Sequence, residues 1–83
     1  MKVLFFASVR EQLGCAELQL AYESETMTTE TLRDALIARG GDRWRDVLMQ
    51  PNLICAVNQA VAHQTTPLAA DDEVAFFPPV TGG

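Results

Sequence analysis

The sequence has 83 residues and a mass of 9.1 kDa, enough for one small hydrophobic core and too short for a second one. Apolar residues make up 48% of the chain and charged residues 20%, a composition that excludes a disordered or low-complexity polymer. Eleven acidic and six basic residues give a formal net charge of -5, the wrong sign for binding nucleic acid or an anionic lipid surface. The longest apolar stretches are far shorter than the roughly 20 residues that span a bilayer. We therefore expect a cytoplasmic protein that binds neither nucleic acid nor membrane.

Two strands are predicted near the start of the chain. Residues 2–7 are rich in β-branched and aromatic side chains. Residues 16–22 alternate, with three apolar side chains on one face: Leu18, Leu20 and Tyr22. The connection, residues 8–14, is slightly longer than a tight hairpin and has room for one helical turn.

One main helix follows. Thr28 or Thr29 offers a hydroxyl for the N-cap, and Gly40-Gly41 ends the helix. Residues at three- and four-residue spacing suggest its packed face: Leu32, Ala35, Leu36 and Arg39.

A second, short helix is predicted between the two glycines and Pro51, with Asp42 as its cap. Trp44, Val47 and Leu48 share one face of it, and Trp44 is interpreted as a packing anchor rather than a ligand platform.

The remaining strands lie in the second half of the sequence. Residues 53–57 read as a strand buried on both faces, and Asn58-Gln59 reads as a tight reversal into a short return strand. Residues 74–77 form the last strand, which Pro78-Pro79 ends because proline cannot donate ladder hydrogen bonds. The predicted class is therefore α+β, with a mixed sheet packed on one main helix.

The usual catalytic constellations are missing from the sequence. His63 is the only histidine and lies in a polar segment, where an exposed turn residue is the simpler interpretation. Asp71-Asp72-Glu73 reads as a solvated turn, because consecutive carboxylates diverge instead of converging on a cation. Cys15 and Cys55 are too few and too far apart for a metal cluster, so we expect reduced, structural thiols and no metal site.

The end of the sequence is its most informative part. Two prolines stiffen the exit from the last strand, and Gly82-Gly83 gives a thin tip that lets another enzyme approach the terminal carbonyl closely. A Gly-Gly end alone also fits a frayed terminus.

Three segments of the sequence together resemble one known family. They are Lys2-Val3-Leu4-Phe5-Phe6-Ala7 with Val9-Arg10-Glu11, then Ala56-Val57-Asn58-Gln59, and Asp72-Glu73-Val74-Ala75-Phe76-Phe77-Pro78-Pro79-Val80-Thr81-Gly82-Gly83. The chain is similar over its whole length to the small subunits of molybdopterin synthase, the MoaD family of ubiquitin-like sulfur carriers. The last segment is the specific part, since other ubiquitin-like sulfur carriers share only the Gly-Gly end. One departure is Ala70-Asp71, where the family usually has Asp-Gly, so the geometry of that turn is open.

The resemblance implies a ubiquitin-like β-grasp domain over residues 1–77 and an extended tail over residues 78–83. It implies that Gly83 carries the reacting group as an acyl-adenylate and then as a thiocarboxylate. The rest of the tail enters the active sites of partner enzymes: Pro78, Pro79, Val80, Thr81 and Gly82. The resemblance implies that the chain binds no cofactor and has no catalytic side chain of its own. Its implied role is that of the non-catalytic, sulfur-donating subunit of an enzyme complex.

The partners implied are equally specific. A ubiquitin-activating-type adenylating enzyme uses ATP and Mg²⁺ to activate the terminal carboxylate, and a sulfur-supplying protein provides a persulfide. The large subunit of molybdopterin synthase, in a heterotetramer, then uses the thiocarboxylate to convert cyclic pyranopterin monophosphate into the dithiolene of molybdopterin. Two alternatives are a related carrier for thiamine thiazole synthesis or tRNA thiolation, and a plain β-grasp interaction module with an inert tail.

A docking surface is expected beside the tail. The first and last strands are apolar on both faces, whereas one helix covers only one side of a sheet, so some apolar side chains should face outward. Phe77 and Val80 are the favoured pair because they lie nearest the tail, with Phe76 as the alternative outward residue.

Overall fold

A computed structural model describes residues 1–21, 27–62 and 65–79 of the chain as an α+β fold with one mixed sheet. The sheet contains five strands: β1 (Lys2–Phe5), β2 (Glu17–Gln19), β3 (Ile54–Val57), β4 (Ala60–Val61) and β5 (Glu73–Phe77). Three helices accompany it: α1 (Ala7–Leu13), α2 (Thr29–Gly40) and α3 (Asp42–Leu48). None of these helices has the length and apolar character needed to cross a membrane.

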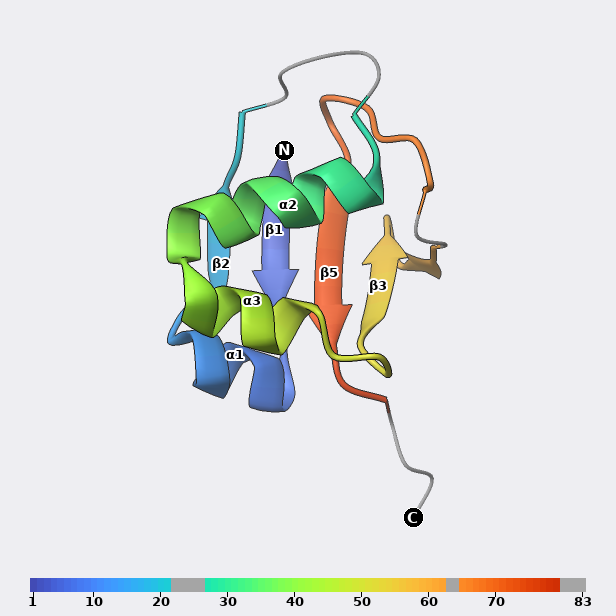
Figure 1. The fold of residues 1–83 in the computed structure, drawn as a ribbon. Helices are drawn as coiled ribbons and strands as arrows, with labels where there is room; N and C mark the ends of the chain where they lie inside the picture. The colour runs from blue at the N-terminus through green and yellow to red at the C-terminus, as the bar shows by residue number, and fades with distance from the viewer. Residues whose placement is uncertain (22–26, 63–64, 80–83) are drawn as a thin grey trace.

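The first and last strands of the described chain lie side by side at the centre of the sheet. The strand order is β2-β1-β5-β3-β4, in which β1 and β5 are parallel and all other neighbours are antiparallel. Figure 1 shows α2 and α3 crossing in front of β1 and β5, with α1 below α3. The helices therefore cover one face of the sheet and leave the other open.

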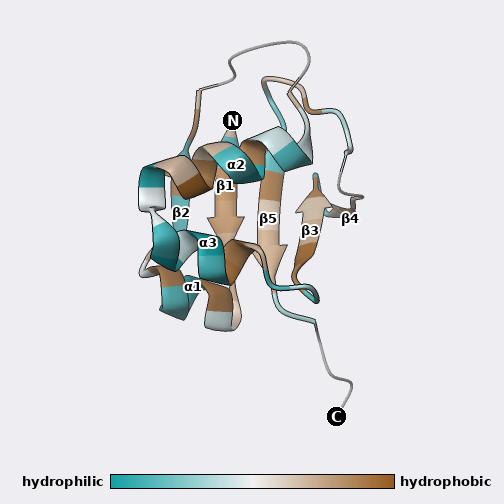
Figure 2. Cartoon of the chain, in the orientation of Figure 1, coloured by the Kyte–Doolittle hydropathy of each residue, from teal (hydrophilic) through white to brown (hydrophobic). Residues whose placement is uncertain are grey.

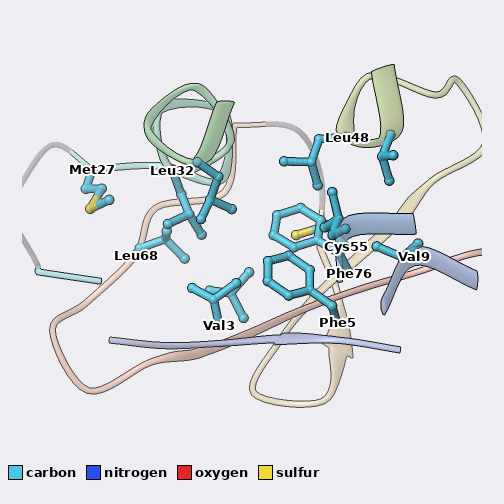
Figure 3. Close-up of a cluster of buried hydrophobic side chains, with 13 residues drawn as sticks. Val3, Phe5, Val9, Met27, Leu32, Leu48, Cys55, Leu68 and Phe76 are labelled. Atoms are coloured by element: carbon cyan, nitrogen blue, oxygen red, sulfur yellow. The ribbon is translucent and has the colours of Figure 1, made fainter. Parts of the chain in front are cut away.

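The core fills the space between the sheet and the helices. Figure 3 shows Phe5 and Phe76 together at its centre, and their stacked ring centroids are 6.0 Å apart. Trp44 from α3 meets Phe5 edge to face at 5.5 Å, which confirms its interpretation as a packing anchor. Leu32 and Leu36 of α2 are fully buried on the same cluster.

The segment after the first strand differs from the prediction. It is a seven-residue helix, not a connection with a single turn, and it begins at Ala7, so the strand ends at Phe5. Val9 and Leu13 lie one helical turn apart and are both buried, which gives this helix its own contact with the core. Gly14 ends it in the left-handed conformation, with φ 68°.

The two longer helical predictions need smaller corrections. Thr28 is the N-cap of α2, where its hydroxyl accepts a hydrogen bond from the Thr31 amide at 3.3 Å. Arg39 is exposed and takes no part in the packed face of α2, on which Thr29 is buried instead. Asp42 does not cap α3, because Gly41 occupies the N-cap position and Asp42 is the first helical residue.

A hydrogen-bonded turn joins β3 to β4 and to the start of β5. Asn58 and Gln59 both have positive φ, 50° and 70°, as the predicted tight reversal requires. The Asn58 side chain donates to Asp72 at 2.9 Å and accepts from the Glu73 amide at 3.0 Å. Asp72 also accepts from the Ala69 amide at 2.7 Å, so this carboxylate organises the turn and is more than a solvated group.

The turn at Ala70-Asp71, whose geometry the sequence left open, does not use the left-handed conformation. Among the described residues, positive φ values outside glycine occur at Ala7, Asn58 and Gln59. The hydrogen bond from the Asp72 amide to the Ala69 carbonyl, 3.1 Å long, closes this turn without it.

Candidate functional site

The last strand decides which side chains surround the start of the tail. Along β5, Val74 and Phe76 are fully buried against the helices, whereas Ala75 and Phe77 lie on the opposite face and are half-buried. Phe76 is therefore a core residue, and Phe77 is the aromatic side chain on the open face. The phase of this strand could not be read from the sequence, because all four residues are apolar.

The open face of the sheet carries a continuous apolar surface, which we call the open-face patch. Phe77 is paired with Ile54 of β3, and Ala75 with Leu4 of β1 on one side and Ala56 on the other. Figure 2 shows that β1, β3 and β5 are hydrophobic over most of their length. The patch consists of Leu4, Ile54, Val61, Ala75 and Phe77, which surround the buried Ala56.

The open face is divided into an apolar and a charged end. Lys2 is paired with Glu73 in the sheet, and its ammonium lies 3.7 Å from the Glu17 carboxylate on the neighbouring strand. Lys2 and Glu73 lie at the start of β5, four residues before Phe77, and Glu17 borders the patch as the partner of Leu4. The apolar end is therefore the one from which the chain continues into Pro78 and Pro79.

The predicted tail is only partly within the described residues. Pro78 and Pro79 follow β5 directly and are half-buried. The other predicted tail residues, Val80, Thr81, Gly82 and Gly83, lie outside the described residues, and so does His63. The structure therefore describes the first two residues of the tail, which we call its root, and the surface beside them.

Two cysteine thiols, Cys15 and Cys55, lie among the described residues. Burial raises the pKa of the Cys55 thiol above its ordinary value of 9.0, and the Arg33 guanidinium offsets part of that rise. Cys15 is half-buried, and its thiol lies 3.4 Å from the Glu17 carbonyl oxygen. In the described part of the chain, no three His, Cys, Asp or Glu side chains gather as metal ligands. Both described cysteines are free thiols.

The raised pKa of Cys55 predicts a loss of stability in alkali. Since the folded state holds the thiol neutral, its contribution is fully present below pH 9.0 and is lost as pH rises through the higher folded pKa. We expect the free energy of unfolding to fall above pH 9.0 more steeply in the natural chain than in Cys55→Ala. Urea unfolding from neutral to alkaline pH measures both slopes, and parallel curves would contradict the assignment.

One side chain near the core escaped the sequence analysis. Arg33 follows Leu32 on α2 and has the appearance of an ordinary solvated residue in the helical pattern. In the structure it is half-buried, and its guanidinium carbon lies 5.8 Å from the centroid of the Phe76 ring. Its position three residues before Leu36, at the border of the apolar stripe, is the only sequence signal that pointed to this place.

Comparisons with known proteins show the family and the fold. The model of the ThiS family matches residues 3–83. Molybdopterin synthase sulfur carrier subunits from Escherichia coli (strain K12) and Haemophilus influenzae are 47% and 42% identical, over 100% of this chain and 99% of each relative.

Two solved structures share the architecture. The crystal structure of SAMP1 from Haloferax volcanii is 27% identical with a TM-score of 0.76, covering 99% of this chain and 97% of that one. The solution structure of Urm1 from Trypanosoma brucei is 22% identical with a TM-score of 0.73, covering 99% and 93%. These similarities confirm the expected ubiquitin-like β-grasp fold.

Proposed function

Because the chain belongs to the ThiS family, we propose that it is the sulfur carrier subunit of a molybdopterin synthase, as the resemblance in its sequence implied. The observation that carries this function is the identity of 47% over the whole chain to a subunit of that name. The family match extends to residue 83 and thus includes the Gly-Gly end. In this function a thiocarboxylate on Gly83 donates sulfur to cyclic pyranopterin monophosphate to form the dithiolene of molybdopterin.

The large subunit of the synthase is the partner that the function requires. We propose one chain beside each active site of a dimeric large subunit, which gives a heterotetramer. An adenylating enzyme of the ubiquitin-activating type converts the Gly83 carboxylate to an acyl-adenylate with ATP and Mg²⁺. Sulfur from a persulfide of a supplying protein then displaces AMP.

The tail reaches these active sites from the apolar end of the open-face patch. The last six residues extend up to roughly 20 Å at about 3.3 Å per residue, which is enough to enter a buried pocket. Because Phe77 lies on the same face as Leu4 and Ile54, one docked surface fixes where the tail begins. We propose that both enzymes use this patch in turn, so that their complexes with the chain exclude each other.

Phe77→Ala is expected to weaken the complex with the large subunit by about 1 kcal/mol or more, the size of an interface hot spot. The stability of the free chain should change little, since Phe77 lies outside the core. Titration calorimetry and urea unfolding measure the two quantities.

The neighbouring substitution Phe76→Ala is the matched control. It removes a fully buried ring and should lower stability by about 3–5 kcal/mol, without a specific loss of affinity in the molecules that remain folded. An unchanged affinity for Phe77→Ala would contradict a role of the open-face patch in docking.

Mass spectrometry after co-expression with the activating enzyme tests the function itself. Replacement of one carboxylate oxygen by sulfur adds about 16 Da to the chain. The modified chain should then convert cyclic pyranopterin monophosphate to molybdopterin when the large subunit is added. An unmodified mass would favour the alternative of an interaction module with an inert tail. A modified chain that is inactive with the large subunit would favour one of the related carriers.

A further inference from the structure

A cavity lies on the flank of the core where the helical layer meets β3. It has a volume of about 340 Å³, and six of the residues that line it are Arg33, Met49, Gln50, Pro51, Leu53 and Cys55. Arg33 comes from α2, Cys55 from β3, and the other four from the connection between α3 and β3. All of these side chains except Arg33 are uncharged at neutral pH.

Arg33 enters this cavity with hydrogen-bonding capacity that the described chain does not use. Its Nε is buried and has no hydrogen-bond partner within residues 1–21, 27–62 and 65–79. The ion pairs of the described residues join Lys2 to Glu17 and Arg45 to Asp42, and neither involves Arg33. Phe76 contacts one face of the guanidinium, an interaction that does not satisfy the N–H donors. A buried donor without an acceptor is destabilising, so the free chain holds this group at a disadvantage.

The chemistry of the cavity selects its ligand. A guanidinium presents two parallel N–H donors that match the two oxygens of a carboxylate. The volume of the cavity lies near the lower end of the range found for ligand pockets, so it accommodates one side chain rather than a cofactor. The walls formed by Met49, Pro51 and Leu53 suit the methylene groups of an acidic residue.

The place of the cavity indicates where the carboxylate comes from. Leu53 directly precedes Ile54, which is paired with Phe77 at the root of the tail. A protein that holds the tail therefore passes close to the cavity. Free anions are repelled by the net charge of -5, whereas a side chain delivered by a docked protein is held there by the rest of the interface.

We infer that the cavity around Arg33 receives an aspartate or glutamate side chain of the synthase large subunit, paired with the Arg33 guanidinium. This inference rests on the proposed function, since it names a second contact of the same complex. The contact lies on the helical side of β3, so the large subunit wraps around the edge of the sheet as well as covering the open-face patch.

Affinity for the large subunit, compared between two arginine variants of α2, tests the inference. Arg33→Met keeps the aliphatic stem and removes the donors, and should weaken binding about tenfold or more. Arg39→Met makes the same change at an exposed position of the same helix and should alter binding less than about twofold. Arg33→Lys keeps the charge without the fork and should lie between them. The effect should shrink as salt rises.

The stability of the free chain supplies the second readout. Arg33→Met should unfold at the same urea concentration as the natural chain or a higher one, because it removes an unpaired donor. Equal affinity of Arg33→Met and the natural chain would overturn the inference, and so would a loss of affinity matched by a loss of stability. A shift of the Arg33 Nε–H resonance with inorganic phosphate, together with unchanged binding of Arg33→Met, would assign a free-anion site instead. Failure of the natural chain to bind the large subunit would refute the proposed function itself.

Discussion

We expect a chain that carries one residue after Gly83, or that ends at Gly82, to lose sulfur transfer completely and to keep its fold. In the proposed function the reacting carboxylate lies at the end of two residues without Cβ atoms, since such a backbone can pass a narrow channel and let a nucleotide approach the carbonyl. An added residue moves the carboxylate, and Gly83→Ala adds a methyl group where the nucleotide or the sulfur must fit. All three changes are therefore expected to abolish thiocarboxylate formation.

The measurement combines intact mass with thermal unfolding. The mass should lack the gain of about 16 Da that marks the thiocarboxylate, while the unfolding midpoint stays that of the natural chain. A matched control carries the same extension behind a protease site, and removal of the extension should restore activity. Full activity in a variant whose extension is still present by mass would contradict the role of Gly83.

Gly40→Ala is expected to destabilise the domain by about 2 kcal/mol, in the range of an overpacked core. Helix propensity alone predicts a gain, since alanine is favoured over glycine inside a helix by about 1 kcal/mol. A Cβ at Gly40, however, would overlap the Trp44 indole. Because that ring packs edge to face on Phe5, the indole cannot move away without disturbing the centre of the core.

Two comparisons isolate the cause. Gly14→Ala meets nothing within 4 Å and introduces only the strain of a positive φ, so its penalty should be smaller. The penalty of Gly40→Ala should largely disappear in a Trp44→Ala background, which a double-mutant cycle measures. A stable Gly40→Ala chain, or the same penalty in both backgrounds, would show that Trp44 is not the cause.

Local signals explain which parts of the fold could be predicted from the sequence. Asn58-Gln59 between two apolar segments indicated the tight turn, and Thr28 followed by the pattern of Leu32 and Leu36 indicated α2. These signals depend on neighbours in the chain, so the elements were correct to within a few residues. The helix α1 was underestimated because its two buried residues, Val9 and Leu13, mark only one turn of the helical pattern.

Features that depend on distant parts of the chain were out of reach. Alternation could not assign the faces of β5, since Val74, Ala75, Phe76 and Phe77 are all apolar, and only the position of the helices makes Phe76 the buried ring. The link from Asn58 to Asp72 joins residues that no short pattern connects. For the site, the role of Gly83 came from a resemblance, whereas Arg33 gained its meaning only from the cavity that three separate elements build around it.

The central pairing of β1 with β5 has a consequence for the synthesis of the protein in the cell. A ribosome delivers β5 last, yet this strand supplies Val74 and Phe76 and joins β1 to β3. A nascent or truncated chain that lacks it has two unconnected strand pairs and an open core, so folding must wait until β5 has been synthesised. If an activating enzyme docks on the completed sheet, as proposed above, it meets chains that already carry the residues leading to Gly83, and prematurely terminated products give it no surface to bind.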